Sequence, residues 1–142
     1  MDCFANIKIL SQNVHKNGKT VHNLLEQYAN GTDILFIQEA PFCLIRKTIS
    51  TTSEEGDDVV GPPIHAAWQV VNCFDRHLKT QVCSYVNRRT LSKFQLSLDA
   101  AINTEPNALF FTLSSCLGGH SASFANIYNP PRTADGTVKA LL

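Results

Sequence analysis

The chain has 142 residues, of which 44% are apolar, so it can form one hydrophobic core and disorder over most of its length is excluded. Twelve Lys and Arg balance twelve Asp and Glu, so the whole chain has no net charge to attract nucleic acid, and phosphate binding would need local groups. The five cysteines form no Cys-x-x-Cys pair and leave one unpaired. This argues against disulfides and a zinc cluster and predicts reduced, mostly buried thiols. No signal-peptide pattern or membrane-length apolar run is present, so we expect an intracellular protein without a membrane partner.

The first predicted strand covers Ile7–Val14. Its alternation brings Asn13 to the end of a face that begins with isoleucines. A helix is predicted next, because four apolar residues follow the i, i+3, i+4, i+7 pattern: Val21, Leu24, Leu25 and Tyr28. Asn30-Gly31 predicts a left-handed stop for this helix.

The segment Asp33–Glu39 is the centre of the pattern. Its four apolar residues, Ile34 to Ile37, are too few for a helix and predict a strand buried on both faces, which implies an α/β fold. Strand, helix, strand with short loops predicts a βαβ unit, so Asn13 and Glu39 should face one crevice. Glu39 is the first candidate functional residue, because a carboxylate at the end of a buried strand needs a partner; alternatively it simply reaches solvent.

Residues 46–63 have no sustained period and are rich in Ser, Thr and acidic residues, which predicts a long surface loop. Its carboxylates favour a solvated face over a cation site. The remainder predicts short strands that extend a mixed sheet in antiparallel fashion: residues 68–71, 80–86, 94–98, 108–113 and 121–128. Leu117–His120 is the predicted turn between the last two strands, and residues 137–142 are expected to begin a helix.

Three stretches occur in this order: Ile-Leu-Ser-Gln-Asn13-Val14, Asp33-Ile-Leu-Phe-Ile-Gln-Glu39-Ala-Pro and Ala-Asn-Ile-Tyr128-Asn129-Pro-Pro131. The ordered set resembles the endonuclease/exonuclease/phosphatase superfamily, which includes apurinic/apyrimidinic endonucleases and DNase I-like nucleases. The Gln-Glu-Ala-Pro and Tyr-Asn-Pro-Pro endings are most similar to the endonuclease domains of fungal LINE-type retrotransposons, and residues 63–68 and 85–89 are also similar. The resemblance covers nearly the whole chain.

This resemblance implies a DNase I-like, four-layer α/β sandwich, of which residues 1–142 would form the N-terminal half. It implies Mg²⁺-dependent hydrolysis of DNA phosphodiesters, with Glu39 as a metal-binding carboxylate. By the same pattern Asn13 helps to hold the metal and the scissile phosphate, and Tyr128 orients the phosphate. Nucleic-acid contacts are expected from Arg88, Arg89 and Asn129. The alternatives are a half-buried strand tyrosine at Tyr128 and a plain exposed surface at the arginine pair.

The family also uses Gly-Asp-x-Asn and Ser-Asp-His segments, which supply the water-activating residue, transition-state donors and the catalytic histidine. Neither segment occurs in the 142 residues, so we expect a partial domain that is inactive alone, and nuclear if it derives from a retrotransposon. By the same analogy, an apolar sheet face would be left open. Two alternatives stay open: a non-catalytic remnant that binds nucleic acid or a protein, and an unrelated α/β domain in which Asn13, Glu39 and Tyr128 coincide by chance.

Overall fold

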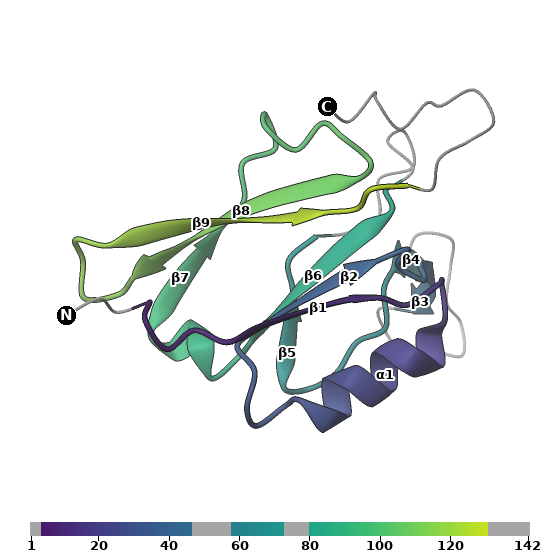
Figure 1. Ribbon diagram of the computed structural model, residues 1–142, viewed down its shortest axis with the longest axis horizontal. Helices are drawn as coiled ribbons and strands as arrows, with labels where there is room; N and C mark the ends of the chain where they lie inside the picture. Colours follow the sequence, from purple (N-terminus) through teal and green to yellow (C-terminus); the bar gives the residue numbers. More distant parts are fainter. Residues whose placement is uncertain (1–3, 47–57, 73–79, 131–142) are drawn as a thin grey trace.

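The computed structural model describes residues 4–46, 58–72 and 80–130, which form a mixed α/β structure with nine strands and one α-helix in that part of the chain (Figure 1). The first sheet has the strand order β1 (Ile9–Asn13), β2 (Ile34–Gln38), β6 (Val82–Asn87) and β5 (Trp68–Val70). The second has the order β7 (Phe94–Ser97), β8 (Ala108–Ser115) and β9 (Ser121–Ile127). A short 3₁₀ helix, η1 (Thr90–Ser92), connects β6 to β7.

The chain begins with the βαβ unit that the sequence predicts. Strands β1 and β2 pair in parallel on either side of helix α1 (Gly18–Gln27) in the sequence, and the other neighbours in both sheets are antiparallel. Asn17 caps α1, because its Oδ1 accepts a hydrogen bond from the Thr20 amide at 3.1 Å. The predicted stop at Asn30-Gly31 is wrong: α1 ends at Gln27 and Gly31 does not have a positive φ. Amides beyond the helix instead bond to the Tyr28 carbonyl.

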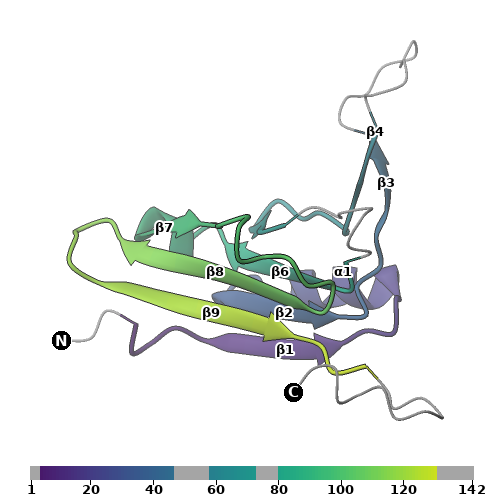
Figure 2. The same ribbon diagram turned by 90° about the horizontal axis from the view of Figure 1, so that it is seen from above.

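Three layers are stacked, with α1, the first sheet and the second sheet in that order (Figures 1 and 2). Between α1 and the first sheet lies one cluster of buried apolar residues: Val14, Val21, Leu25, Leu35, Ile37, Ala40, Trp68, Cys83 and Tyr85. Between the two sheets lies another: Ile34, Val86, Phe94, Phe111 and Leu113. Because β2 contributes to both clusters, its apolar run is buried on both faces, as its sequence predicts.

The prediction of a continuous loop over residues 46–63 is wrong at its two ends. Strand β3 (Cys43–Arg46) pairs antiparallel with β4 (Asp58–Gly61), and Figure 2 shows this hairpin projecting away from the two larger sheets. The apolar runs Leu44-Ile45 and Val59-Val60 are too short to stand out beside the acidic and hydroxyl residues that surround them. The middle of that predicted loop, and the helix predicted at residues 137–142, lie outside the described residues.

Other sequence predictions have mixed outcomes. The turn between β8 and β9 is confirmed, with Gly118 and Gly119 at φ of 85° and 87°. Cys83 is buried and Cys116, which follows the end of β8, is exposed, so the prediction of mostly buried thiols holds for Cys83 and not for Cys116 and stays untested for the other three cysteines. Across residues 4–46, 58–72 and 80–130, no helix is both long enough and apolar enough to cross a membrane.

Candidate functional site

Asn13 and Glu39 lie at the same end of the first sheet, where the adjacent parallel strands β1 and β2 have their carboxyl ends. Backbone hydrogen bonds tie the two strand ends together, from the Val14 amide to the Gln38 carbonyl at 3.1 Å and from the Lys16 amide to the Glu39 carbonyl at 2.7 Å. The predicted convergence of Asn13 and Glu39 on one place in the fold is therefore confirmed as geometry.

Backbone strain is concentrated at this end of the sheet. In the described part of the chain, the non-glycine residues with positive φ are His15 at 52°, Lys16 at 61° and Glu39 at 49°. A left-handed conformation costs an L-residue about 1–2 kcal/mol. Asn13 offsets part of this cost, because its Oδ1 accepts a hydrogen bond from the His15 amide at 3.0 Å. Strain of this kind is typical of functional positions.

Both oxygens of the Glu39 carboxylate are engaged. The Tyr128 hydroxyl donates to Oε1 at 3.0 Å, and Nδ1 of His15 lies 2.9 Å from Oε2. The Glu39 side chain is 24% exposed and that of His15 82%, so the carboxylate is held from the protein side by a buried tyrosine and from the solvent side by a histidine. Tyr128 directly follows β9 of the second sheet, so the site joins both sheets.

These contacts shift the pKa values of both Glu39 and Tyr128. The pKa of Glu39 is lowered, and the largest cause is the hydrogen bond from Tyr128. Hydrogen bonds from His15 and Asn13 lower it further, whereas desolvation by burial acts in the opposite direction and raises it. Burial is the main reason that the pKa of Tyr128 is raised, and its hydrogen bond to Glu39 and the charge of Glu39 add to the effect. The pair is therefore a carboxylate with a neutral hydroxyl donor around neutral pH.

A buried amide network behind the site sets the position of Tyr128. Asn126 is fully buried, and its Nδ2 donates to the Cys83 carbonyl at 2.9 Å, to Ser84 Oγ at 3.1 Å and to the Ile37 carbonyl at 3.3 Å. Its Oδ1 accepts from Gln38 Nε2 at 2.8 Å. Asn126 thus fastens β9 onto β2 and β6, and Tyr128, two residues further on the same face, is carried to Glu39.

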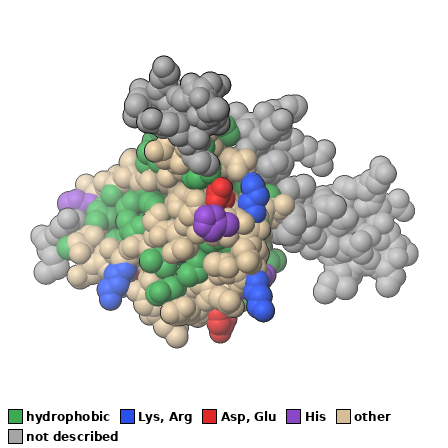
Figure 3. Space-filling view, turned by 45° about the vertical axis from the view of Figure 1, so that its right-hand side comes forward, with side chains coloured by type: hydrophobic (Ala, Val, Ile, Leu, Met, Phe, Trp, Pro, Cys, Tyr) green, Lys and Arg blue, Asp and Glu red, His purple; other side chains and the backbone are tan. Residues whose placement is uncertain are grey.

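The surface around the site has few charges. Lys16 Nζ donates to Gln81 Oε1 at 2.9 Å, which fixes one cation beside the strand ends. Figure 3, which brings the right-hand side of Figure 1 forward, shows an acidic, a histidine and a basic side chain next to one another on a surface of mainly uncharged groups. The polar neighbours of the Glu39 carboxylate at the surface are therefore His15 and one lysine.

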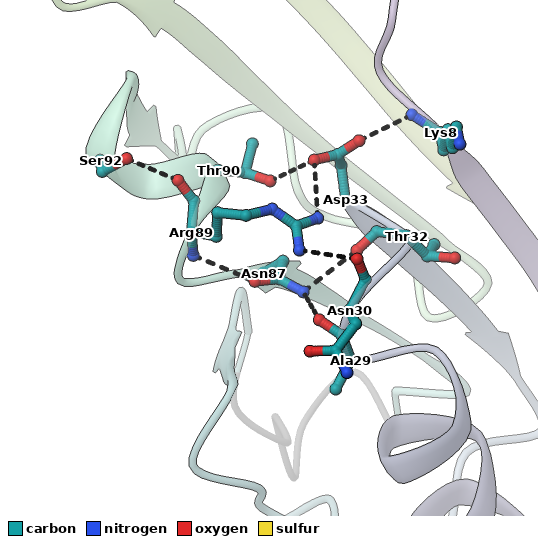
Figure 4. Close-up of polar contacts among 9 residues, drawn as sticks. All are labelled: Lys8, Ala29, Asn30, Thr32, Asp33, Asn87, Arg89, Thr90 and Ser92. Carbon is teal, nitrogen blue, oxygen red and sulfur yellow. Dashed lines mark hydrogen bonds and ion pairs between the residues drawn. The ribbon is translucent and has the colours of Figure 1, made fainter.

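The other residues expected to bind nucleic acid are divided between two places. Asn129 directly follows Tyr128 and is exposed at the same edge. Arg88 and Arg89 follow β6, which is antiparallel to β2, so they lie at the opposite end of the strands from Glu39. Arg89 is engaged there, with Nη1 donating to the Asn30 carbonyl at 3.1 Å and Nη2 lying 3.5 Å from Asp33 Oδ1 (Figure 4). The structure does not bring the arginines to Glu39.

Three residues at or behind the site were missed as functional candidates in the sequence: His15, Gln38 and Asn126. A signal existed for Asn126, because alternation along β9 puts it on the same face as Tyr128. Gln38 precedes Glu39 at the end of an apolar run, which also marks it as a polar group requiring a partner. No sequence signal indicated that His15, in a predicted turn, would reach Glu39.

The oxygens of Glu39 and Asn13 are the hard ligands that Mg²⁺ prefers. A carboxylate has about four lone-pair positions, so it can accept two hydrogen bonds and still coordinate a cation. Across the described residues, three or more His, Cys, Asp or Glu side chains do not gather into a metal-ligand cluster.

Comparison of the chain with protein-family models, curated proteins and solved structures finds no match.

Proposed function

We propose that the Glu39 site is the metal- and phosphate-binding part of a Mg²⁺-dependent phosphodiesterase acting on DNA, of the endonuclease/exonuclease/phosphatase type. The observation that supports it is the meeting of Asn13, Glu39 and Tyr128 at one place, at the ends of β1, β2 and β9. These are the residues that the sequence resemblance assigns to metal and phosphate. The finer fold proposed with it is half of a DNase I-like four-layer sandwich, which the helix–sheet–sheet order supports.

Each residue has a role that follows from its contacts. Glu39 and the Asn13 side-chain oxygen would hold Mg²⁺, which when bound polarises a phosphate oxygen and neutralises its charge. Tyr128 fixes the carboxylate by its hydrogen bond to Oε1. Because it is neutral, its one O–H would instead orient a phosphate oxygen if the hydroxyl turned from Glu39 to a bound phosphate. His15 bonds to the other oxygen from the solvent side, so an arriving cation or phosphate would meet its ring first.

We also expect little or no cleavage by this polypeptide alone, because the Gly-Asp-x-Asn and Ser-Asp-His segments do not occur in the 142 residues. One carboxylate and one neutral amide hold Mg²⁺ weakly. A missing general acid–base group or transition-state donor typically costs about two to four orders of magnitude in rate. Such losses do not multiply fully when groups act as a unit, but the loss of one alone would move the rate towards the detection limit.

A plasmid-nicking assay tests the proposal together with a binding measurement. Purified chain and the Glu39→Gln variant are incubated with supercoiled DNA and Mg²⁺, and Mn²⁺ is titrated into both while amide NMR signals are followed. We expect equal background nicking, and Mn²⁺ broadening centred on Asn13 and Glu39 in the parent that the variant lacks. Equal broadening in both proteins would overturn the metal site, and nicking by the parent alone would overturn the expected inactivity.

A second function, non-catalytic binding by a protein of the same fold, is favoured by one observation: protein groups already satisfy both Glu39 oxygens. In that case the site holds the two sheets together and the surface around it binds a partner. DNA binding that is equal in parent and Glu39→Gln proteins, without any Mn²⁺ effect, would favour this function over the first.

A further inference from the structure

A cavity of about 510 Å³ lies at the edge of the sheets opposite Glu39. It is partly open to solvent and is lined by the segment before β1, the residue before β2, η1 with the start of β7, and the end of β8. Six of its lining residues carry the argument: Ile7, Asp33, Arg89, Lys93, Phe94 and Leu117. Its volume is within the range of about 300–1,000 Å³ that is typical of small-molecule sites.

The one carboxylate among these lining residues is already satisfied by the protein (Figure 4). Oδ1 of Asp33 accepts from the Thr90 hydroxyl at 2.6 Å and lies 3.5 Å from Arg89 Nη2, while Oδ2 accepts from the Lys8 amide at 2.9 Å. Thr90 is buried, so this bond is sheltered from water. Asp33 therefore holds the wall of the cavity together and does not require a cationic ligand.

The cations of the cavity have donors to spare. Toward the described residues, the guanidinium of Arg89 uses two of its five N–H groups, on Asn30 and Asp33, and its side chain is 48% exposed. Lys93 forms no ion pair with the described residues and is exposed. Two cations against one carboxylate leave a single positive charge at the cavity, which complements one negative charge on a ligand.

The rest of the wall is apolar. Phe94 is buried, and its ring stacks on Phe4 with the centroids 4.9 Å apart, so packing holds this part of the cavity wall in place. Leu117 is 97% exposed at the rim, in the turn that Gly118 and Gly119 allow with their positive φ angles. A bound apolar group would cover Leu117 and remove its side chain from water, which is favourable.

From these observations we infer that the cavity binds a small organic monocarboxylate. Its carboxylate pairs with Lys93 and the free donors of Arg89, and its ring or chain lies against Ile7, Phe94 and Leu117. A dication or an amine would meet unpaired positive charge, and a neutral ligand would leave the cationic donors unanswered. The inference does not depend on the function proposed for Glu39, because the two sites share no residue.

Ligand charge is tested with a matched series of 4-phenylbutyrate, 4-phenylbutanamide and 4-phenylbutylamine, titrated into the chain while amide NMR shifts are followed. We expect the carboxylate to bind about fivefold more tightly than the amide, with the amine weakest, and the shifts to centre on Ile7, Phe94 and Leu117. Equal affinity of acid and amide, shifts centred elsewhere, or no saturable shift for the acid would each overturn the inference.

Two variants and one further ligand complete the test. Lys93→Met keeps the side-chain length without the charge and should weaken carboxylate binding about fivefold, whereas the matched Lys19→Met, on α1, should leave it unchanged. Equal effects of the two variants would contradict a role for Lys93. A dinucleoside monophosphate also carries one negative charge; if it binds more tightly than 4-phenylbutyrate, the cavity is a nucleic-acid contact and the carboxylate proposal is wrong.

Discussion

The Tyr128 hydroxyl donates to Glu39 Oε1 at 3.0 Å across 89 positions of sequence. This single hydrogen bond joins the end of a strand in the first sheet to the residue that follows β9 in the second. It is also the largest influence on the lowered pKa of Glu39. The two residues that the sequence resemblance selects for metal and phosphate are therefore coupled in the folded chain, because each shifts the pKa of the other.

Replacing Tyr128 with Phe should raise the pKa of Glu39 towards its ordinary value. The ring stays in place while the donor to Oε1 is lost, and the hydrogen bonds from His15 and Asn13 remain. A carbon NMR titration of the Glu39 carboxyl measures the shift. Tyr28→Phe, a change near the end of α1, is the matched control and should leave that titration unchanged. An unchanged Glu39 titration in Tyr128→Phe would mean that the bond does not persist in solution.

The lowered pKa of Glu39 also predicts an acid dependence of stability. The folded chain binds this proton more weakly than the unfolded chain, whose carboxyl has a pKa near 4.5, so the stabilisation is complete above about that pH. It is lost as the pH falls through the lower folded pKa. Glu39→Gln lacks this contribution, so the difference in urea midpoint between parent and variant should shrink as the pH falls below about 4.5. A difference that stays constant with pH would contradict the prediction.

Cys83 and Cys116 should differ strongly in reactivity. Burial raises the pKa of Cys83 to about 12, so at about pH 8 only about one molecule in ten thousand has the Cys83 thiolate. Cys116 is exposed in the same chain and serves as the internal control. Iodoacetamide labelling followed by peptide mass spectrometry should modify Cys116 in the folded protein and Cys83 only after urea is added. Comparable labelling rates in the folded chain would show that the sheet opens readily around Cys83.

The meeting of Asn13 and Glu39 was predictable because it depends on local rules. A short apolar run, an amphipathic helix and a preceding strand define a βαβ unit, and parallel strands bring their carboxyl ends to one edge. The predicted place of Tyr128 came from the family resemblance instead. Parity along β9 gives its face but not the partner sheet, which depends on how the two sheets pack.

What the sequence could not reveal depends on tertiary contacts. His15 reaches Glu39 because two consecutive residues adopt the left-handed conformation without glycine, which composition does not signal. Arg88 and Arg89 lie at the far edge because β6 runs antiparallel to β2, a pairing that no local pattern specifies. The β3–β4 hairpin was not predicted, because its short apolar runs stand among polar residues in the sequence.

The last prediction concerns Asn126, the fully buried amide between the sheets. Asn126→Ala removes the donor to the Cys83 and Ile37 carbonyls and the acceptor for Gln38, and it leaves a small cavity. Unsatisfied buried groups and the cavity together should lower the free energy of unfolding by about 2–4 kcal/mol, measured by urea denaturation. Asn23→Ala, on the exposed side of α1, should change it by less than about 0.5 kcal/mol. Because Asn126 carries Tyr128 to Glu39, its loss should also raise the Glu39 pKa in the folded variant. An Asn126→Ala protein as stable as Asn23→Ala, with its Glu39 titration unchanged, would show that the network neither joins the sheets nor positions the tyrosine.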